Sequence, residues 1–124
     1  MATVLVVDDD DQVRDVVRGF LRELGHSALE ASNGLEALAA LSEQPIDLVI
    51  SDVFMPEKEG LTTIEEIRAK YPKTKILVMS GGGSDDGGVL ILELGKQFGA
   101  ESGIHKPFQF EEFRLKVERL LLPK

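Results

Sequence analysis

The sequence predicts an α/β fold in which five parallel strands form one sheet with helices on both of its faces. Short apolar runs rich in β-branched residues alternate with stretches whose apolar residues recur every three or four positions. This alternation repeats five times, and no linker or low-complexity tract interrupts it. Because right-handed crossovers leave few other arrangements for such a pattern, we expect one doubly wound domain over residues 1–124.

The expected strands are short and mostly apolar. A run without polar residues, such as Val4–Val7, is typical of a strand that is covered on both faces. The last strand is the weakest of the set, because it has only three residues. The expected strands are Thr3–Val7, His26–Ala31, Ile46–Ser51, Lys75–Ser80 and Gly103–His105.

The expected helices are recognised by apolar stripes and by the residues that end them. Asp10 or Asp11 can cap the first helix, and Gly25 ends it. We interpret Asn33-Gly34 as a turn before the second helix. The expected stripes run from Val13 to Leu24, from Leu35 to Leu41, from Leu61 to Ile67, from Val89 to Phe98 and from Phe110 to Leu121.

The composition excludes several classes of function. The chain has 14 Lys and Arg against 22 Asp and Glu, a net charge of -8, so we expect no nucleic-acid binding by this chain alone. It has no cysteine, which excludes thiol chemistry and disulfides. No apolar run approaches the roughly 18 to 20 residues of a membrane span, and the N-terminus lacks the basic start of a signal peptide. We therefore expect a cytoplasmic protein without a membrane partner.

Polar residues that could bind a ligand or take part in a reaction lie at the ends of four of the five expected strands. Asp8 and Asp9 follow the first, Asp52 the third, Ser80 ends the fourth, and Lys106 follows the fifth. In parallel sheets ligands bind at the carboxyl ends of the strands, where these side chains would meet. Clustered carboxylates repel one another, and Mg²⁺ is a suitable cation to hold them ionised.

The same set of residues suggests phosphoryl transfer. The hydroxyl of Ser80 and the ammonium of Lys106 would help to neutralise phosphoryl oxygens beside a bound metal ion. A carboxylate nucleophile would give an acyl phosphate. The residue that most needs an explanation is Asp52, because an aspartate at the end of a buried strand is costly to desolvate.

Four motifs in order resemble the receiver domain of two-component response regulators. They are Val6-Val-Asp-Asp9, Asp52-Val-Phe-Met-Pro56 with Gly60, Met79-Ser80-Gly81 and Lys106-Pro-Phe108. Each motif alone is a weak signal, whereas all four at strand ends are a specific one. The resemblance covers the whole chain and implies a CheY-like, flavodoxin-like (βα)5 sandwich with strand order 2-1-3-4-5.

The resemblance also implies a role for each matching residue. Asp52 corresponds to the phosphoacceptor and Asp9 to a direct Mg²⁺ ligand. Asp8 would act on the metal mainly through water, and the backbone carbonyl of Phe54 would complete the metal site. The phosphoryl group would come from a sensor histidine kinase or a histidine phosphotransfer protein.

The remaining matches concern the phosphoryl group. Ser80 corresponds to the switch hydroxyl and Lys106 to the lysine that pairs with the phosphate. The family has a cis Lys106-Pro107 bond, whereas proline statistics alone give cis only about 5%.

The expected partner face consists of the fourth helix, the fifth strand and the fifth helix. The apolar run Val89–Leu92 spans a full helical turn, so either part of it stays exposed, as partner surfaces do, or the helix is buried more deeply in the domain. The resemblance implies that a downstream protein or a second copy of the chain binds there. The residues assigned to this face are Val89, Leu90, Leu92, Gly103 and Phe108.

The chain departs from the family pattern at three places. Gly103 stands where the family often has a switch Tyr or Phe, so the glycine-rich loop Gly81–Gly88 is an alternative carrier of the conformational change. The span from Ser80 to Lys106 also looks long for the family. Finally, Phe54 and Gly82 occupy positions that tune hydrolysis of the phosphoaspartate, and we expect slow self-dephosphorylation.

Two other functions are consistent with parts of the sequence. One is a pseudo-receiver that is never phosphorylated and serves as an interaction module, which Gly103 would suit. The other is a haloacid-dehalogenase-like phosphatase, because Asp9-x-Asp11-x-Val13 after an apolar strand matches its nucleophile motif. The phosphatase hypothesis also has Asp85 and Asp86 as an acid pair, but it leaves Asp52 unexplained.

We expect no output domain after Pro123 in this chain. We therefore expect any response to pass through another protein, through phosphoryl shuttling, or through a domain lost from this chain.

Overall fold

The fold is a five-stranded parallel sheet between two layers of helices. The computed structural model describes residues 1–53, 59–81 and 93–122. Within these ranges the strand order is β2-β1-β3-β4-β5, which confirms the expected doubly wound topology. No helix in the described ranges is both long enough and apolar enough to cross a bilayer.

The strands agree with the expected ones to within one or two residues. Ile46 was expected to open the third strand, but pairing begins at Leu48 and extends through Asp52. The strands are β1 (Thr3–Val7), β2 (Ser27–Ala31), β3 (Leu48–Asp52), β4 (Lys75–Gly81) and β5 (Ser102–Lys106).

The helices also follow the expected stripes. They are α1 (Asp11–Glu23), α2 (Gly34–Glu43), α3 (Glu59–Lys70) and α5 (Phe110–Leu121), and residues 93–98 are helical as well. Residues 89–92 of the expected fourth helix lie outside the described ranges.

The caps of two helices can be compared with the sequence predictions. Asp10 caps α1, accepting a hydrogen bond from the backbone N–H of Gln12 at 2.9 Å. The interpretation of Asn33-Gly34 as a turn was wrong: Asn33 caps α2 and accepts from the N–H of Glu36 at 2.8 Å. Asparagine favours both turns and helix caps, for the same reason that its side-chain oxygen satisfies nearby backbone donors.

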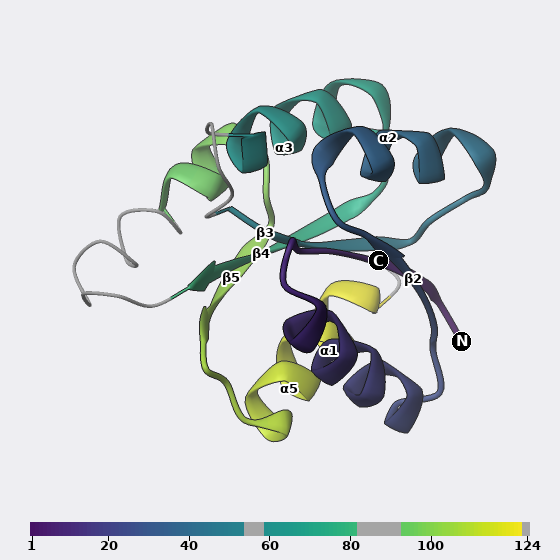
Figure 1. Ribbon diagram of the computed structural model, residues 1–124, viewed down its shortest axis with the longest axis vertical. Helices are drawn as coiled ribbons and strands as arrows, with labels where there is room; N and C mark the ends of the chain where they lie inside the picture. The colour runs from purple at the N-terminus through teal and green to yellow at the C-terminus, as the bar shows by residue number, and fades with distance from the viewer. Residues whose placement is uncertain (54–58, 82–92, 123–124) are drawn as a thin grey trace.

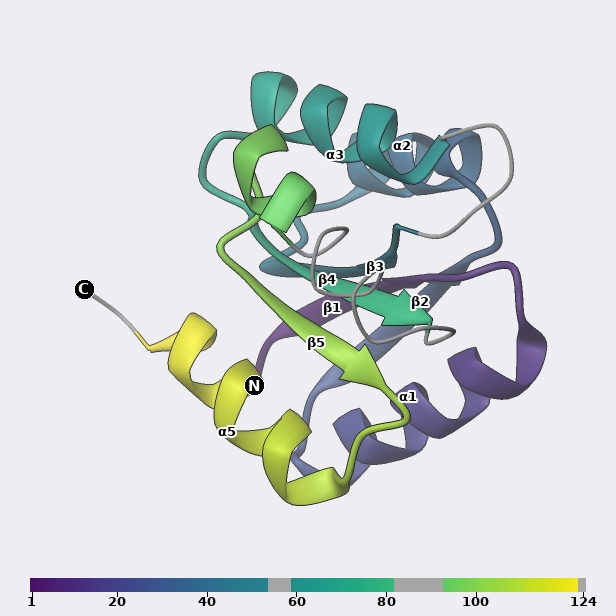
Figure 2. The ribbon, with the colours of Figure 1, turned by 90° about the vertical axis from the view of Figure 1, so that its left-hand side faces the viewer.

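The alternation of side chains along each strand sorts the core into two layers. In β1, Val4 and Val6 pack in one cluster, whereas Leu5 and Val7 pack in the other. Figures 1 and 2 show α2, α3 and residues 93–98 on one face of the sheet and α1 and α5 on the other. We call these the α2–α3 layer and the α1–α5 layer. Both faces are apolar because both are covered by helices.

Aromatic side chains hold the α1–α5 layer together. Phe113 of α5 is fully buried and stacks on Phe108 with ring centroids 5.6 Å apart. The ring of Phe20 from α1 lies 5.4 Å from that of Phe113. The two helices are thus joined through aromatic contacts as well as through the sheet.

We predict that Phe113→Ala lowers the free energy of unfolding by about 3–5 kcal/mol, because it leaves a cavity where a buried ring was packed. The matched control is Leu115→Ala on the same helix, where the side chain is 58% exposed and the expected change is within about 0.5 kcal/mol. Urea unfolding of both variants measures the difference. Equal losses in the two variants would contradict this account of the core.

Candidate functional site

The register of the sheet brings the polar strand ends together. Val7 of β1 lies opposite Ser51 of β3, so Asp8 and Asp52 follow at adjacent positions on neighbouring strands. On the other side of β3, Gly81 of β4 lies opposite Lys106 of β5. The sequence prediction that these residues meet at one edge is therefore confirmed.

A half-buried lysine connects two buried carboxylates at this edge. Asp8 is fully buried, and Asp52 is 4% exposed. The Nζ of Lys106 donates to Oδ2 of Asp8 at 3.0 Å and to Oδ2 of Asp52 at 3.4 Å. One ammonium thus serves as the counterion of two carboxylates. An ion pair that is removed from water in this way depends on each of its partners.

The carboxylates keep Lys106 charged in spite of its surroundings. Burial by itself lowers the pKa of Lys106, but the hydrogen bond to Asp8 and the charges of Asp52 and Asp8 outweigh this effect. The pKa of Lys106 therefore lies above its ordinary value. The ammonium is a permanent positive charge at neutral pH.

A third carboxylate makes the cluster suitable for a metal ion. Carboxylate oxygens of Asp8, Asp9 and Asp52 all lie within 4.8 Å of one another. Asp9 is exposed, so the cluster is accessible from solvent on that side. Three carboxylates against one ammonium leave an excess of negative charge, and the donors are oxygens, as Mg²⁺ prefers. The residues present fit the magnesium ion that the sequence predicted.

Ser80 lies at the same edge as the cluster, but the alternation of side chains along β4 puts it on the other face of the sheet. It shares the alternation of Ile76 and Val78, whose side chains pack in the α2–α3 layer. Its hydroxyl is buried and has no hydrogen-bond partner among the residues that the structure describes. A buried donor without a partner is costly, which makes this hydroxyl a candidate to bind an added group.

Several other residues predicted for the site lie outside the described part of the chain. Phe54, Gly82, Val89, Leu90 and Leu92 lie outside the described ranges, so their predicted roles stay predictions. The Lys106-Pro107 peptide bond is cis, as the family resemblance implied.

Two residues of the predicted partner face are described. Gly103 lies in β5 opposite Val78 and is partly exposed. Phe108 packs toward α1 and α5, on Phe20 and Phe113. The assignment of both residues to a partner face stays a prediction.

Sequence reasoning did not identify Arg14 as part of this region. Its Nη1 donates to the backbone carbonyl of Asp8 at 2.5 Å, and its Nε donates to Oε1 of Glu30 at 2.9 Å. An arginine in the first turn after an acidic run was the available signal. Arg14 lies on α1, whereas its partner Glu30 lies 16 residues further along on β2, a separation that no local pattern indicates.

An apolar groove opens beside Lys106. It lies between α1 and the segment that links β5 to α5, and its volume is about 490 Å³. Val16, which contributes to it, is 52% exposed. Its lining consists of Asp10, Gln12, Val13, Val16, Val17, Lys106, Pro107 and Phe108.

The chain is similar to many regulators over almost its full length. A family model for the response regulator receiver domain matches residues 4–118. The probable C4-dicarboxylate response regulator DctR of Priestia megaterium is 35% identical over 94% of this chain. The sensor kinase CckA of Brucella abortus is 35% identical over 97% of it. The chain spans 50% of the length of DctR and 12% of that of CckA.

Solved structures agree with the family match. The receiver domain of NtrX from Brucella abortus superposes with a TM-score of 0.88 at 32% identity, covering 95% of this chain and 97% of that one. The chemotaxis protein CheY4 of Vibrio cholerae superposes with a TM-score of 0.85 at 33% identity, covering 98% and 99%. The chain therefore belongs to the response regulator receiver domain family of two-component systems.

Proposed function

We propose that Asp52 accepts a phosphoryl group from a phosphohistidine of a sensor histidine kinase or a histidine phosphotransfer protein. The observation that carries this proposal is that the Asp52 carboxylate lies 3.4 Å from Nζ of Lys106 and within 4.8 Å of carboxylate oxygens of Asp8 and Asp9. A carboxylate oxygen of Asp52 attacks phosphorus, an O–P bond forms, and the P–N bond breaks as the imidazole leaves. The product is an acyl phosphate on Asp52.

The other residues of the cluster would bind the metal ion and stabilise the charge of the phosphoryl group. Asp8, Asp9, Asp52 and the backbone carbonyl of Phe54 would hold Mg²⁺, which neutralises charge on the phosphoryl oxygens when bound. Lys106 supplies a fixed positive charge within reach of Asp52. This positioning lowers the barrier by electrostatic stabilisation, which costs no reorganisation during the reaction.

Phosphorylation would then change the surroundings of Ser80. The added group brings negative charge and strong acceptor oxygens. The buried hydroxyl of Ser80 is a donor without a partner among the described residues, and it would gain one in a phosphoryl oxygen. The rearrangement around Ser80 is the switch that alters partner binding in this proposal.

Two surfaces suit the two kinds of partner. The apolar groove beside Lys106 is the surface that a phosphodonor protein would cover in order to reach Asp52. A downstream protein or a second copy of the chain would bind the face formed by β5, α5 and the expected fourth helix, which precedes β5. Leu115 on that face is 58% exposed beside Glu112, Lys116 and Arg119, which gives an apolar centre with charged surroundings. The proposed setting is the cytoplasm.

The first prediction concerns the acceptor. Incubation with acetyl phosphate and Mg²⁺ should add the mass of one phosphoryl group to the wild type and none to Asp52→Asn, because an amide is no nucleophile here. Intact-mass spectrometry measures both. No gain in the wild type would favour the pseudo-receiver, and a gain retained in Asp52→Asn would direct attention to Asp9 and phosphatase-like chemistry.

The second prediction concerns the metal. The melting temperature of the wild type should rise with Mg²⁺ concentration, because the ion binds the folded state. Asp9→Asn should lose most of this shift. Because Asp9 is exposed and adds to the excess negative charge of the cluster, its replacement should not lower the metal-free melting temperature. Asp15→Asn, which removes the same charge from an exposed position on α1, is the matched control and should retain the shift. An undiminished shift in Asp9→Asn would exclude Asp9 as a ligand.

The third prediction concerns the counterion. Without Mg²⁺, Lys106→Met should lower the free energy of unfolding by about 3 kcal/mol at neutral pH, because buried carboxylates lose their partner. The pKa of Lys106 is raised in the fold, so its contribution is complete below its unfolded pKa and is lost as pH rises through the folded pKa. The difference between wild type and Lys106→Met should therefore persist at neutral pH and shrink only in strong alkali.

Urea unfolding across pH measures this difference. Lys96→Met is the control, since Lys96 is exposed, and its effect should stay within about 0.5 kcal/mol. A Lys106→Met variant as stable as the wild type in the absence of metal would refute the counterion role.

A further inference from the structure

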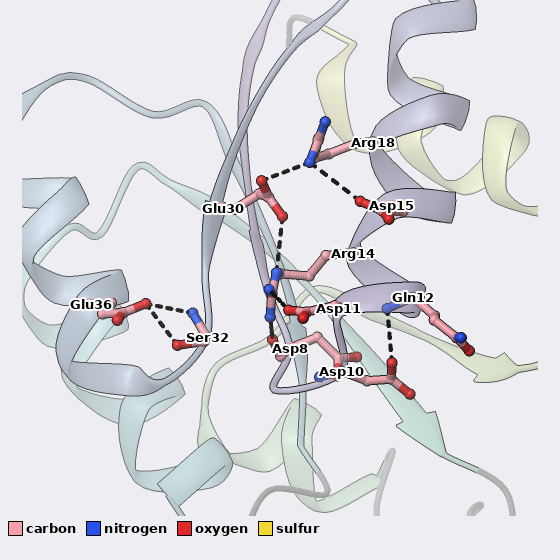
Figure 3. A network of polar contacts seen from close by, with 10 residues as sticks. All are labelled: Asp8, Asp10, Asp11, Gln12, Arg14, Asp15, Arg18, Glu30, Ser32 and Glu36. Atoms are coloured by element: carbon pink, nitrogen blue, oxygen red, sulfur yellow. Dashed lines mark hydrogen bonds and ion pairs between the residues drawn. The ribbon is translucent and has the colours of Figure 1, made fainter.

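Arg14 binds the acidic segment Asp8–Asp11 through the backbone carbonyl of Asp8 and the carboxylate of Asp11. Figure 3 shows its guanidinium surrounded by oxygens of Asp8, Asp11 and Glu30. The side chain of Arg14 is only 12% exposed. Its donors therefore reach three separate acceptors, and a planar guanidinium can serve all three only in one orientation.

The backbone and the side chain of Asp8 are both held by hydrogen bonds. Its backbone N–H donates to the carbonyl of Ala31 at 3.1 Å, and its own carbonyl accepts from Arg14. Its Oδ1 accepts from the N–H of Asp10 at 2.9 Å, while Oδ2 accepts from Lys106. The direction of the carboxylate thus depends on backbone contacts as well as on the lysine. Only Arg14 holds the carbonyl among these partners.

Glu30 in turn fixes Arg14. It projects from β2, and its Oε1 accepts from Nε of Arg14 at 2.9 Å. Its other oxygen, Oε2, accepts from Nη1 of Arg18 at 2.7 Å. A carboxylate held by two arginines of α1 has little rotational freedom (Figure 3). The position of β2 therefore determines where the guanidinium of Arg14 lies.

We propose that Arg14, oriented by Glu30, is a positioning residue that holds Asp8 and Asp9 in the arrangement that binds Mg²⁺. This inference rests on the proposed function, since it concerns the same cation site. In the described residues Arg14 binds Asp8 through its backbone carbonyl, and its other contacts are with the carboxylates of Asp11 and Glu30, which are not part of the metal-binding cluster. Its effect is therefore that of an outer-shell partner, which orients ligands without being one.

Simple electrostatics predicts the opposite result, which makes the inference testable. Removal of a positive charge next to three carboxylates should strengthen cation binding if charge alone matters. Loss of positioning should weaken binding even though the site becomes more negative. Arg14→Lys separates the two effects further, because it keeps the charge but cannot reach three acceptors with one planar group.

The experiment is calorimetric titration of Mg²⁺ into the wild type, Arg14→Met and Arg14→Lys. We expect both variants to bind roughly tenfold more weakly than the wild type. Arg22→Met is the matched control: it removes the same charge from an exposed position on the same helix, and in the described residues the side chain of Arg22 forms no hydrogen bond or ion pair with Asp8, Asp11 or Glu30. Its affinity should stay within about twofold of the wild type. Unchanged or tighter binding by Arg14→Met and unchanged binding by Arg14→Lys would overturn the inference.

A second measurement needs no metal. The amide of Asp10 is protected by its hydrogen bond to Asp8, and its hydrogen exchange in the metal-free protein should be faster in Arg14→Lys and in Glu30→Ala. Glu30→Gln retains an acceptor and should restore much of the protection and of the Mg²⁺ affinity. Exchange at Asp10 unaltered by these changes would overturn the positioning role.

The two proposals fail in different ways. A wild-type protein that neither binds Mg²⁺ nor gains a phosphoryl group would refute the proposed function. A wild type that does both, together with Arg14 variants that bind Mg²⁺ equally well, would refute the positioning role alone. If Arg14→Met does not fold, Arg14→Lys and the two Glu30 variants still give the same comparison.

Discussion

The ammonium of Lys106 between Asp8 and Asp52 is the interaction on which the carboxyl edge of the sheet depends. Each carboxylate would be costly to bury alone, and one cation offsets that cost for two of them. It cannot offset the charge of Asp9 as well, so the edge keeps an excess of negative charge. The same imbalance that limits the stability of this edge gives it affinity for a divalent cation.

Strand parity explains why the groups at this edge have different environments. Asp8, Asp52 and Lys106 continue the alternation of Val6, Ile50 and Ile104, which pack in the α1–α5 layer. Ser80 continues the opposite alternation. On the proposed function, a phosphoryl group on Asp52 would be approached by Lys106 from one layer and by Ser80 from the other. It would therefore link residues of the two helical layers.

The sequence was most informative where one local pattern determines the structure. Apolar runs predicted the strands, and the polar residues after them predicted the cluster of Asp8, Asp52 and Lys106. Asn33 was misinterpreted because the same side-chain oxygen suits a turn and a helix cap. Arg14 and Glu30 were missed because their pairing depends on how β2 lies beside α1. Contacts of that kind are tertiary, and no periodicity records them.

Gly103 leaves open how a change at Lys106 would reach α5. A glycine has no side chain whose rotamer could carry the signal along β5. The beginning of that strand is also held, because Arg68 binds Glu101 at 2.7 Å and Glu101 accepts from the N–H of Ile76. Phe108 lies two positions after Lys106, and it stacks on Phe113 of α5. On the proposed function, this aromatic contact is a packed route from the site to α5, where Leu115 is exposed.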